Sequence, residues 1–344
     1  MARGNSTYTT TKSLLYIVFI ALGSFLVGFA LGTLIEFSPP RETSERIGAS
    51  IEEVMQSYIS EVDPIVRRKA VEIIVSHSKL HREIYWDTVK VYPGSWYVVT
   101  FAAYPGLVYE IKVTVLDTCV TEQCDIEVLL KTATWATARD FGRIKSMSFN
   151  FTLESSSWRK YYRLFLDNSY SSEIKNVVVS ITVFFSREII DDEVFKVYSI
   201  SKWVTGHIVY VSDPWSVEYI ASPREVLETG AGDCEDYAVL LAALYRSIGL
   251  KSAIGLVDID GDQKVEHAAA PVYIDEDLSR VELVTEAIYY VLDYSYKGLP
   301  FHYIEDSKTG EGLWLVIDPV MAVNPPRDWR IEHEPYTIVA VITP

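Results

Sequence analysis

Apolar and polar residues are arranged in three different ways along this chain of 344 residues. Residues 14–35 contain no charge and are almost wholly apolar, and as a helix they rise about 33 Å, enough to cross a bilayer core. Residues 43–88 repeat apolar positions every three or four residues, which predicts amphipathic helices. From 92 to 186 aromatic and β-branched residues alternate with polar ones, which predicts at least six antiparallel strands in a β-sandwich.

After residue 188 helix-like and strand-like runs alternate, so the overall prediction is an α+β protein. We expect a transmembrane helix at 14–35, a helical stalk at 43–88, an antiparallel β-sandwich at 89–187 and an α+β domain at 188–344. The first 13 residues form a short cytoplasmic N-terminus in this organisation. The membrane segment exceeds the apolar core of about 7–15 residues of a cleaved signal peptide, which is the alternative interpretation.

The charges that flank the apolar segment predict its orientation. Arg3 and Lys12 precede it, whereas Glu36 and Glu42 are among the residues that follow it. The positive-inside rule then places the N-terminus in the cytoplasm and the rest of the chain outside a cell membrane. Gly28 and Gly32 form a small-xxx-small pair that could join two such helices in a homodimer.

The net charge argues against two kinds of partner, nucleic acid and anionic lipid. The chain has 31 basic and 47 acidic residues, a net charge of −16. This is the wrong sign for binding nucleic acid through phosphates or anionic lipid through a basic patch. An acidic, tyrosine-rich domain outside the membrane suits an archaeal cell surface.

The three cysteines divide into a pair and a single residue. Cys119 and Cys124 lie close together between two strand-like runs, where a disulfide is the natural interpretation in an oxidising space and a metal pair is the alternative. Cys234 is then unpaired, which indicates either a buried inert thiol or one kept for chemistry.

The segment SPREVLETGAGDCEDYAVLLAALYRSIGL, residues 222–250, carries the sharpest chemical signal. Ser222 and Pro223 begin a short helix that Gly230 ends. Asp233 is the predicted N-cap of a second helix, which starts at Cys234. The thiol therefore lies at the positive end of a helix dipole, which favours a thiolate and can hold an oxyanion.

A nucleophilic thiol needs a base and an orienting group, and both occur downstream. His267 lies within a predicted strand, KVEHAAAPVYI, and Asp318 follows another, GLWLVIDPV. The order of these elements, with the motif GDCEDYA at 232–238, resembles the transglutaminase-like superfamily of papain-like Cys-His-Asp enzymes. The resemblance implies that Cys234 is the nucleophile, His267 the general base and acid, and Asp318 the group that orients the imidazole.

That resemblance implies acyl transfer on an amide. We expect a membrane-anchored extracellular cysteine peptidase or amidase acting on proteins or peptides, because GDCEDYA resembles the bacterial and archaeal protease-like branch. A protein-crosslinking transglutaminase is the second interpretation. A non-catalytic envelope protein that uses the same fold to bind a partner is the third. The run at 163–185 resembles the closing strands of GOLD-type and jelly-roll modules, which mostly bind.

Two further sets of site residues are less clearly marked. Trp215 and Tyr210 are candidates for stabilising an oxyanion, although each could equally serve core packing. The acidic neighbours of the thiol should disfavour a thiolate, and a cation would relieve this. Some periplasmic proteases of the superfamily bind calcium at such residues, so Asp233 and Glu235 are calcium candidates, with helix capping as the alternative. No other cofactor is expected. The insert at 275–311 is a candidate lid.

Overall fold

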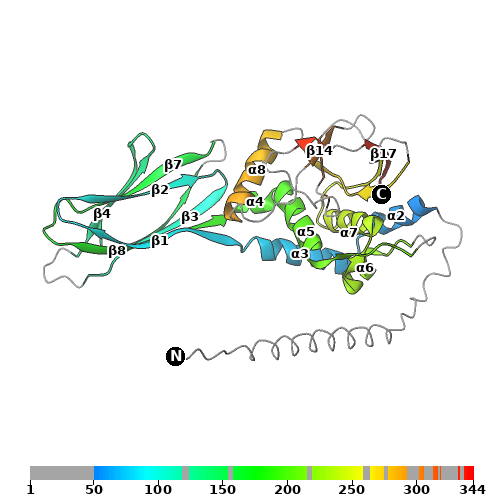
Figure 1. The fold of residues 1–344 in the computed structure, drawn as a ribbon, viewed down its shortest axis with the longest axis horizontal. Helices are drawn as coiled ribbons and strands as arrows, with labels where there is room; N and C mark the ends of the chain where they lie inside the picture. Colours follow the sequence, from blue (N-terminus) through cyan, green and yellow to red (C-terminus); the bar gives the residue numbers. More distant parts are fainter. Residues whose placement is uncertain are drawn as a thin grey trace, which may run out of the picture. The chain divides into compact units, whose positions relative to one another are not determined.

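A computed structural model describes most of the chain after residue 49 (Figure 1). The described residues are 50–117, 124–153, 158–214, 219–258, 264–274, 278–292, 302–305, 313–316, 318, 332–333 and 337–344. The predicted membrane segment at 14–35 lies outside them, as do Gly28 and Gly32. Of the helices in the described ranges, none is long and apolar enough to span a membrane.

The first two described helices are α2, Ile51–Ser60, and α3, Pro64–His77. Asp63 caps α3 by accepting a hydrogen bond from the Ile65 N–H, with Pro64 at the first helical position, as predicted. The helices end at His77 and not at residue 88, because the following residues pair along their length with a later strand.

The predicted stalk instead packs against the C-terminal domain. Met55 and Ile59 of α2 are fully buried, and the Ile59 carbonyl accepts a hydrogen bond from the Arg246 guanidinium at 2.8 Å. Asp63 forms an ion pair with Arg224 at 2.8 Å. Burial of the apolar stripe against α7, described below, explains why these helices do not stand apart.

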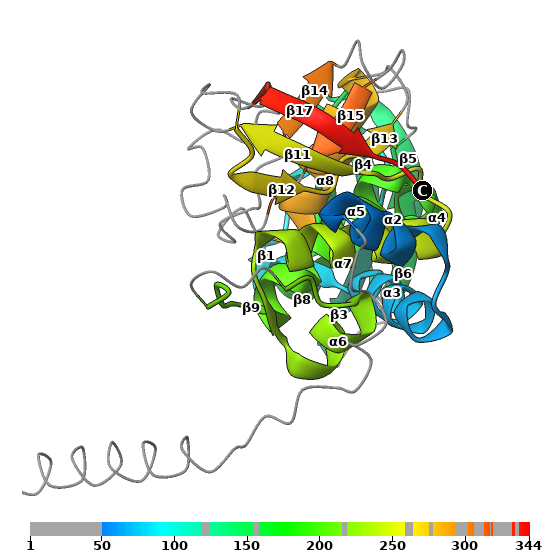
Figure 2. The same cartoon turned by 90° about the vertical axis from the view of Figure 1, so that its right-hand side faces the viewer.

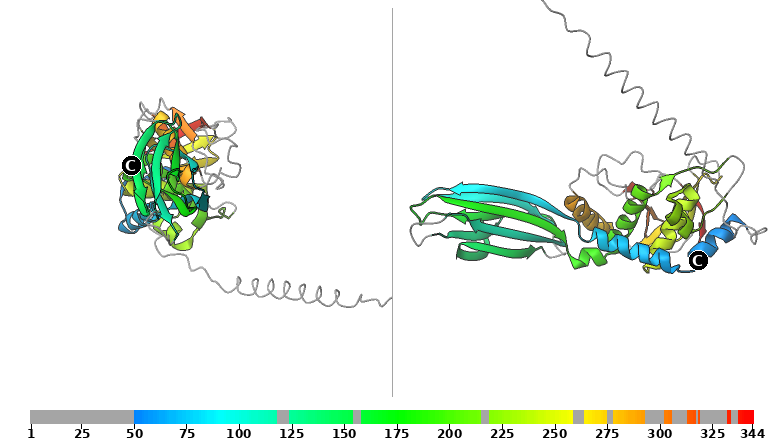
Figure 3. Two further views of the ribbon diagram at one scale, coloured as in Figure 1. Left: turned by 90° about the vertical axis from the view of Figure 1, so that its left-hand side faces the viewer. Right: turned by 90° about the horizontal axis from the view of Figure 1, so that it is seen from below.

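Residues 81–185 form an antiparallel β-sandwich (Figure 3). One sheet has the order β1-β8-β3-β6, comprising β1 (His81–Val91), β8 (Lys175–Phe185), β3 (Leu107–Val115) and β6 (Ser146–Thr152). The other has the order β2-β7-β4-β5, comprising β2 (Trp96–Ala103), β7 (Lys160–Asp167), β4 (Ile126–Thr132) and β5 (Thr137–Ile144). Alternate residues of β3 and β8 are buried between the sheets, which confirms the period-two pattern.

The rest of the described chain mixes helices with short strands. The helices are α4 (Arg187–Asp191), α5 (Glu193–His207), α6 (Pro223–Thr229), α7 (Cys234–Ser247) and α8 (Leu278–Val291). α7 lies at the centre, with every residue from Asp236 to Tyr245 buried. Such a helix is apolar on all sides because other elements cover it all round.

Three small sheets accompany these helices (Figure 2). β9 (Val209–Tyr210) pairs in parallel with β10 (Ala231–Gly232). β12 (His267–Ala269), β11 (Ile254–Asp258) and β17 (Thr337–Ile342) form an antiparallel sheet in that order. β13 (Val272–Ile274), β15 (Leu313–Val316), β14 (His302–Glu305) and β16 (Glu332–His333) form the third.

The sandwich and α8 are joined by specific contacts. The Tyr290 ring lies 4.3 Å from that of Tyr104 between centroids, and its hydroxyl donates to the Ala102 carbonyl at 3.2 Å. Arg82 donates to the Tyr290 carbonyl at 2.9 Å. α8, which belongs to the insert at 275–311, therefore packs against the sandwich, and the lid stays a prediction.

Candidate active site

The start of α7 is built by a reciprocal cap. The Asp233 carboxylate accepts a hydrogen bond from the Asp236 N–H, and the Asp236 carboxylate accepts one from the Asp233 N–H. This capping box satisfies two backbone donors that a helix start leaves without partners, and it fixes Cys234 as the first helical residue. The predicted N-cap is confirmed.

The residues that precede Cys234 are also fixed by contacts with α7. Asp236 also accepts a hydrogen bond from the Ala221 N–H at 2.7 Å, so one carboxylate ties α7 to the residues before α6. A Cβ at Gly232 would lie 2.6 Å from the Asp236 Cβ, closer than two side chains can approach. Gly232 is therefore needed for this carboxylate to reach its partners.

The Cys234 thiol is free and half-buried. It donates a hydrogen bond to Glu235, with 2.9 Å between Sγ and Oε2. Burial raises the pKa of the thiol most, and the hydrogen bond and negative charge of Glu235 raise it further. The backbone N–H of Ala268 is close enough to the sulfur to lower this pKa, which acts in the opposite direction. The thiol therefore lies directly beside β12, at the residue after His267.

His267 and Asp318 meet where the two sheets adjoin. β12 pairs with β11, with His267 opposite Val257, and Asp318 follows β15. Both side chains are buried, and Nε2 of His267 is hydrogen-bonded to Oδ2 of Asp318. Since Nε2 is used in this way, Nδ1 is the imidazole nitrogen that can exchange a proton with a thiol.

A buried hydroxyl pair, which the sequence analysis did not identify, lies near Asp318. Tyr245 of α7 is completely buried, and its hydroxyl is hydrogen-bonded to that of Ser201 on α5 at 2.5 Å. Burial raises the pKa of Tyr245, and the negative charge of Asp318 raises it as well. The sequence does not single out Tyr245, because its hydroxyl has no signature in the periodicity.

Acidic groups around the thiol keep their protons to unusually high pH. Burial raises the pKa of Asp233 to about 7, with further contributions from Glu235 and Asp236. Burial also raises the pKa of Asp236 to about 6, against the backbone hydrogen bonds that lower it. Carboxylates this close together repel one another when all are ionised, so some of them stay protonated. The acidic residues around Cys234 predicted this crowding of negative charge.

The remaining predicted residues have different outcomes. Tyr210 on β9 is close enough to Cys234 for the thiolate charge to raise its pKa, although burial is the larger cause. Trp215 and Cys119 lie outside the described ranges, so neither the second oxyanion candidate nor the disulfide to Cys124 can be placed. Where side chains are described, no group of three or more acidic, histidine or cysteine residues is arranged to hold a metal ion. The calcium site at Asp233 and Glu235 stays a prediction.

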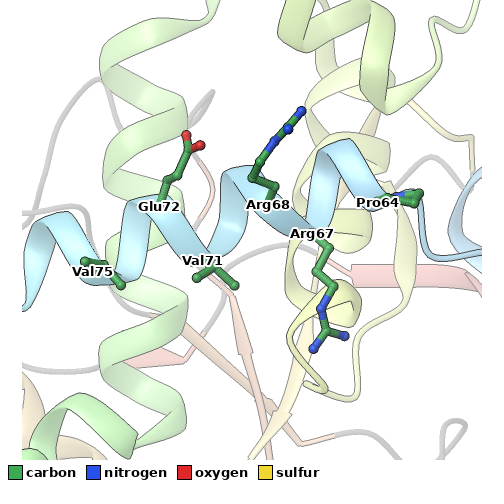
Figure 4. A pocket seen from close by; sticks show the side chains of 6 residues that line it. All are labelled: Pro64, Arg67, Arg68, Val71, Glu72 and Val75. Atoms are coloured by element: carbon green, nitrogen blue, oxygen red, sulfur yellow. The ribbon is translucent and has the colours of Figure 1, made fainter.

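A surface hollow of about 440 Å³ lies along α3, and none of the predicted site residues contributes to it (Figure 4). Its apolar part is formed by two partly exposed valines, one helical turn apart. The residues that line it are Pro64, Arg67, Arg68, Val71, Glu72 and Val75.

Comparison with known families agrees with this geometry. Residues 184–282 match the model of the transglutaminase-like superfamily. The matched part includes Cys234 and His267 and ends before Asp318. This is the superfamily that the GDCEDYA motif predicted, and the match is confined to residues 184–282.

Two solved structures match part of the chain at low sequence identity and low TM-score. A candidate cysteine protease from Cytophaga hutchinsonii is 15% identical, with a TM-score of 0.20, over 57% of this chain and 75% of that chain. A candidate protease from Parabacteroides distasonis is 7% identical, with a TM-score of 0.23, over 57% and 66%. No curated protein matches the sequence.

Proposed function

We propose that this protein is a cysteine peptidase or amidase, with Cys234 as nucleophile, His267 as general base and acid, and Asp318 as the group that orients the imidazole. The observation that carries this proposal is the buried hydrogen bond between His267 and Asp318, one residue away from the Ala268 N–H that contacts the Cys234 sulfur. Three groups from a helix start and two separate sheets converge here, which packing alone does not require.

The reaction follows from the roles of these groups. Nδ1 of His267 takes the thiol proton, and the sulfur attacks the amide carbonyl carbon, so that the C–S bond forms and the carbonyl π electrons move to oxygen. When the C=O bond reforms, the C–N bond breaks and the imidazolium gives its proton to the leaving amine. Water then attacks the thioester, the C–S bond breaks, and a carboxylic acid and the thiol result.

One contact must change before this chemistry can begin. The thiol donates its proton towards Glu235, and this arrangement keeps its pKa high. A substrate that enters beside Cys234 would displace the Glu235 carboxylate and leave His267 as the proton acceptor. Asp318 favours the imidazolium that forms, because its negative charge lies against the ring.

Alkylation of the protein with iodoacetamide across pH 5–10 tests the proposal, with the modified residue identified by mass spectrometry. We expect Cys234 in wild type to react about tenfold or more faster at pH 7 than in the His267→Ala variant. His207→Ala, which removes an exposed imidazole at the end of α5, is the matched control. Equal rates in wild type and His267→Ala would show that the thiol has no base.

Product analysis separates the two enzymatic interpretations. Hydrolysis releases a free carboxylate from a peptide library, whereas a transglutaminase incorporates a labelled primary amine. We expect the hydrolysed product to dominate. If Cys234 is unreactive and no product forms, the non-catalytic envelope protein is the remaining interpretation.

We further propose that this enzyme is held at the outer face of a membrane by residues 14–35. The length of that apolar segment and the basic residues before it support the proposal. Treatment of intact cells with an added protease tests it, because an external domain is digested without lysis.

Addition of a chelator in the alkylation assay tests the proposed calcium role of Asp233 and Glu235. An unchanged alkylation rate would contradict that role.

A further inference from the structure

Exposed aromatic residues gather on the outer face of the sheet β2-β7-β4-β5. Trp96 on β2 is 57% exposed, and its ring stacks on that of Phe165 at 5.3 Å between centroids and an interplanar angle of 28°. Trp135, from the hairpin that joins β4 and β5, is 49% exposed and meets the edge of the same ring at 6.4 Å. Phe165 therefore holds two indoles in place while each keeps about half its surface in water.

Two cations accompany these rings. The Lys131 ammonium lies 4.3 Å from the centre of Phe165, and the Arg163 guanidinium lies 4.5 Å from that of Trp135. We call the five residues Trp96, Lys131, Trp135, Arg163 and Phe165 the tryptophan face. Arg163 is fixed further, because it donates hydrogen bonds to the carbonyls of residues 132 and 133.

The positions of the two cations lower the stability of the folded sandwich. Lys131 and Arg163 are directly opposite one another on β4 and β7, and like charges in that position repel. Neither forms an ion pair with an acidic side chain of the described chain, although the protein as a whole has a net charge of −16. An anionic group placed between them would remove the repulsion.

The backbone conformation of Trp135 is a second feature that destabilises the folded state. Its φ of 67° lies in the left-handed region, which bulky side chains rarely adopt and in which glycine is the usual residue of such hairpins. The Trp135 N–H donates to the Thr132 carbonyl at 3.0 Å, which closes the turn. The left-handed backbone costs about 1–2 kcal/mol, and it places an indole over Arg163 where a glycine would leave the position empty.

We propose that the tryptophan face binds a polysaccharide that carries carboxylate groups. The C–H-bearing faces of sugar rings suit the flat, outward faces of stacked indoles, and a uronate carboxylate suits the Lys131–Arg163 pair. The exposed hydroxyls of Thr132 and Thr134 offer hydrogen bonds to sugar hydroxyls. Residues 132–134 and 159–162 also line an adjoining hollow of about 360 Å³, which contains Arg159 and Lys160 and no acidic side chain.

The pattern of charges favours a short segment of an acidic glycan over a long polyanion. Glu127 and Asp167 lie opposite one another at the other end of the same two strands, where Asp167 pairs with Trp96, so the positive region is confined to the end that carries Trp135. A nucleic acid, with a phosphate at every nucleotide, would meet this acidic end and the net negative charge of the protein. The stacked orientation of Trp96 presents a ring face and does not project an indole into a bilayer.

Calorimetric titration of the full-length protein with fragments of hyaluronan, alginate and polygalacturonate tests the proposal, with uncharged dextran for comparison. We expect at least one of the three uronate polymers to bind and dextran to bind about tenfold or more weakly. Binding of none of the three, or equal binding of dextran, would overturn it. Single-stranded DNA or anionic vesicles that bind as tightly as the best uronate polymer would also overturn it.

Variants locate the site. Trp135→Gly should weaken binding about tenfold or more, while its urea midpoint stays equal to or above that of wild type, because glycine suits the backbone. Lys131→Gln should weaken binding of the charged ligand as well. Trp86→Ala is the matched control, since Trp86 is 63% exposed on β1 of the other sheet. An equal loss of binding in Trp86→Ala, or full binding in Trp135→Gly, would overturn the proposal. The outcome does not depend on the chemistry of Cys234.

Discussion

At Cys234 two neighbours act on the pKa of one thiol in opposite directions. Glu235 accepts the thiol hydrogen bond and raises the pKa, and the nearby Ala268 N–H lowers it. Burial adds to the effect of Glu235, so the protonated form is favoured overall. The position at a helix start, which by itself favours a thiolate, is outweighed in this arrangement.

Glu235→Gln should make the Cys234 thiol more reactive. The change removes a negative charge next to the sulfur and keeps the size of the side chain, so the pKa of the thiol falls and the thiolate forms at lower pH. We expect alkylation by iodoacetamide at pH 8 to accelerate about tenfold. Glu228→Gln, on the exposed face of α6, should leave the rate unchanged. A slower reaction in Glu235→Gln would contradict the role assigned to this carboxylate.

The raised pKa values of Asp233 and Asp236 predict how stability depends on pH. In the folded protein these pKa values are about 7 and about 6, whereas an aspartate in an unfolded chain titrates near pH 4. Between about pH 4 and pH 7 the folded state therefore holds more protons than the unfolded state, and the free energy of unfolding falls as pH rises. We expect a higher urea midpoint at pH 5 than at pH 8.

Asp233→Asn should reduce that difference. Asparagine is also a good N-cap, so the helix start is kept while the titrating group is removed. After allowance for solvent screening, the change in unfolding free energy between pH 5 and pH 8 should shrink by on the order of 1 kcal/mol. Asp87→Asn, on the exposed side of β1, is the control. An unchanged pH dependence in Asp233→Asn would show that another group titrates.

At the residue scale the sequence predicted identities better than contacts. Asp233 as N-cap follows from local rules about helix starts. The pairing of His267 with Asp318 required the family resemblance, because 51 residues separate them and periodicity carries no information on such contacts. The Ala268 N–H was not identified, since a backbone donor has no signature in a side-chain motif.

Among the elements, α7 depends on a backbone that passes very close to it. Gly232 lies against the Asp236 side chain, and that carboxylate holds both the helix start and the Ala221 N–H. The segment GDCED therefore specifies a close approach and a cap together. Its glycine is required by space and not by an unusual φ angle.

Gly232→Ala should destabilise the protein by about 1–3 kcal/mol, because the new methyl group forces the Asp236 carboxylate away from its partners. Urea denaturation measures the change, and the alkylation rate of Cys234 should change with it. Gly206→Ala is the matched control, because no atom lies within 4 Å of its added Cβ and alanine favours the interior of α5. A stable Gly232→Ala protein would show that the α7 start can shift freely.

The elements that the sequence predicted least well are those decided by distant partners. Residues 81–88 were included in the helical region, yet they form most of β1 because β8 offers a full antiparallel ladder. The amphipathic stripe of α2 was recognised, but its partner was not, since a stripe does not identify the surface that covers it. The strands between 96 and 185 were predicted from their alternation, except for β5 (Thr137–Ile144), whose residues are mostly exposed and do not alternate.

For the molecule as a whole, the contact between the sandwich and α8 joins two parts that the sequence predicted as separate domains. Tyr290 packs on Tyr104, donates to the Ala102 carbonyl and lies under the Arg82 guanidinium. The chain reaches α8 after β13 and continues from it towards β14 and β15. The sandwich therefore supports the segment that connects His267 to Asp318.

Tyr290→Ala should lower the unfolding free energy by about 2 kcal/mol, because it removes ring packing and a hydrogen bond at this junction. Tyr290→Phe should lose about 1 kcal/mol, since only the hydroxyl is removed. Circular dichroism during urea denaturation measures both changes. Tyr92→Ala, an exposed tyrosine of the sandwich, should have little effect. If all three variants match wild type, the sandwich and α8 do not stabilise one another.

The hydrogen bond from Cys234 to Glu235 has a consequence for the lifetime of the protein. A thiolate attacks peroxides and disulfides much faster than a thiol does, so a sulfur held as S–H by a neighbouring carboxylate resists oxidation. A substrate that displaces Glu235 exposes the same sulfur to both reactions at once. Oxidative damage should therefore accumulate in molecules that are turning over, while the resting population is preserved.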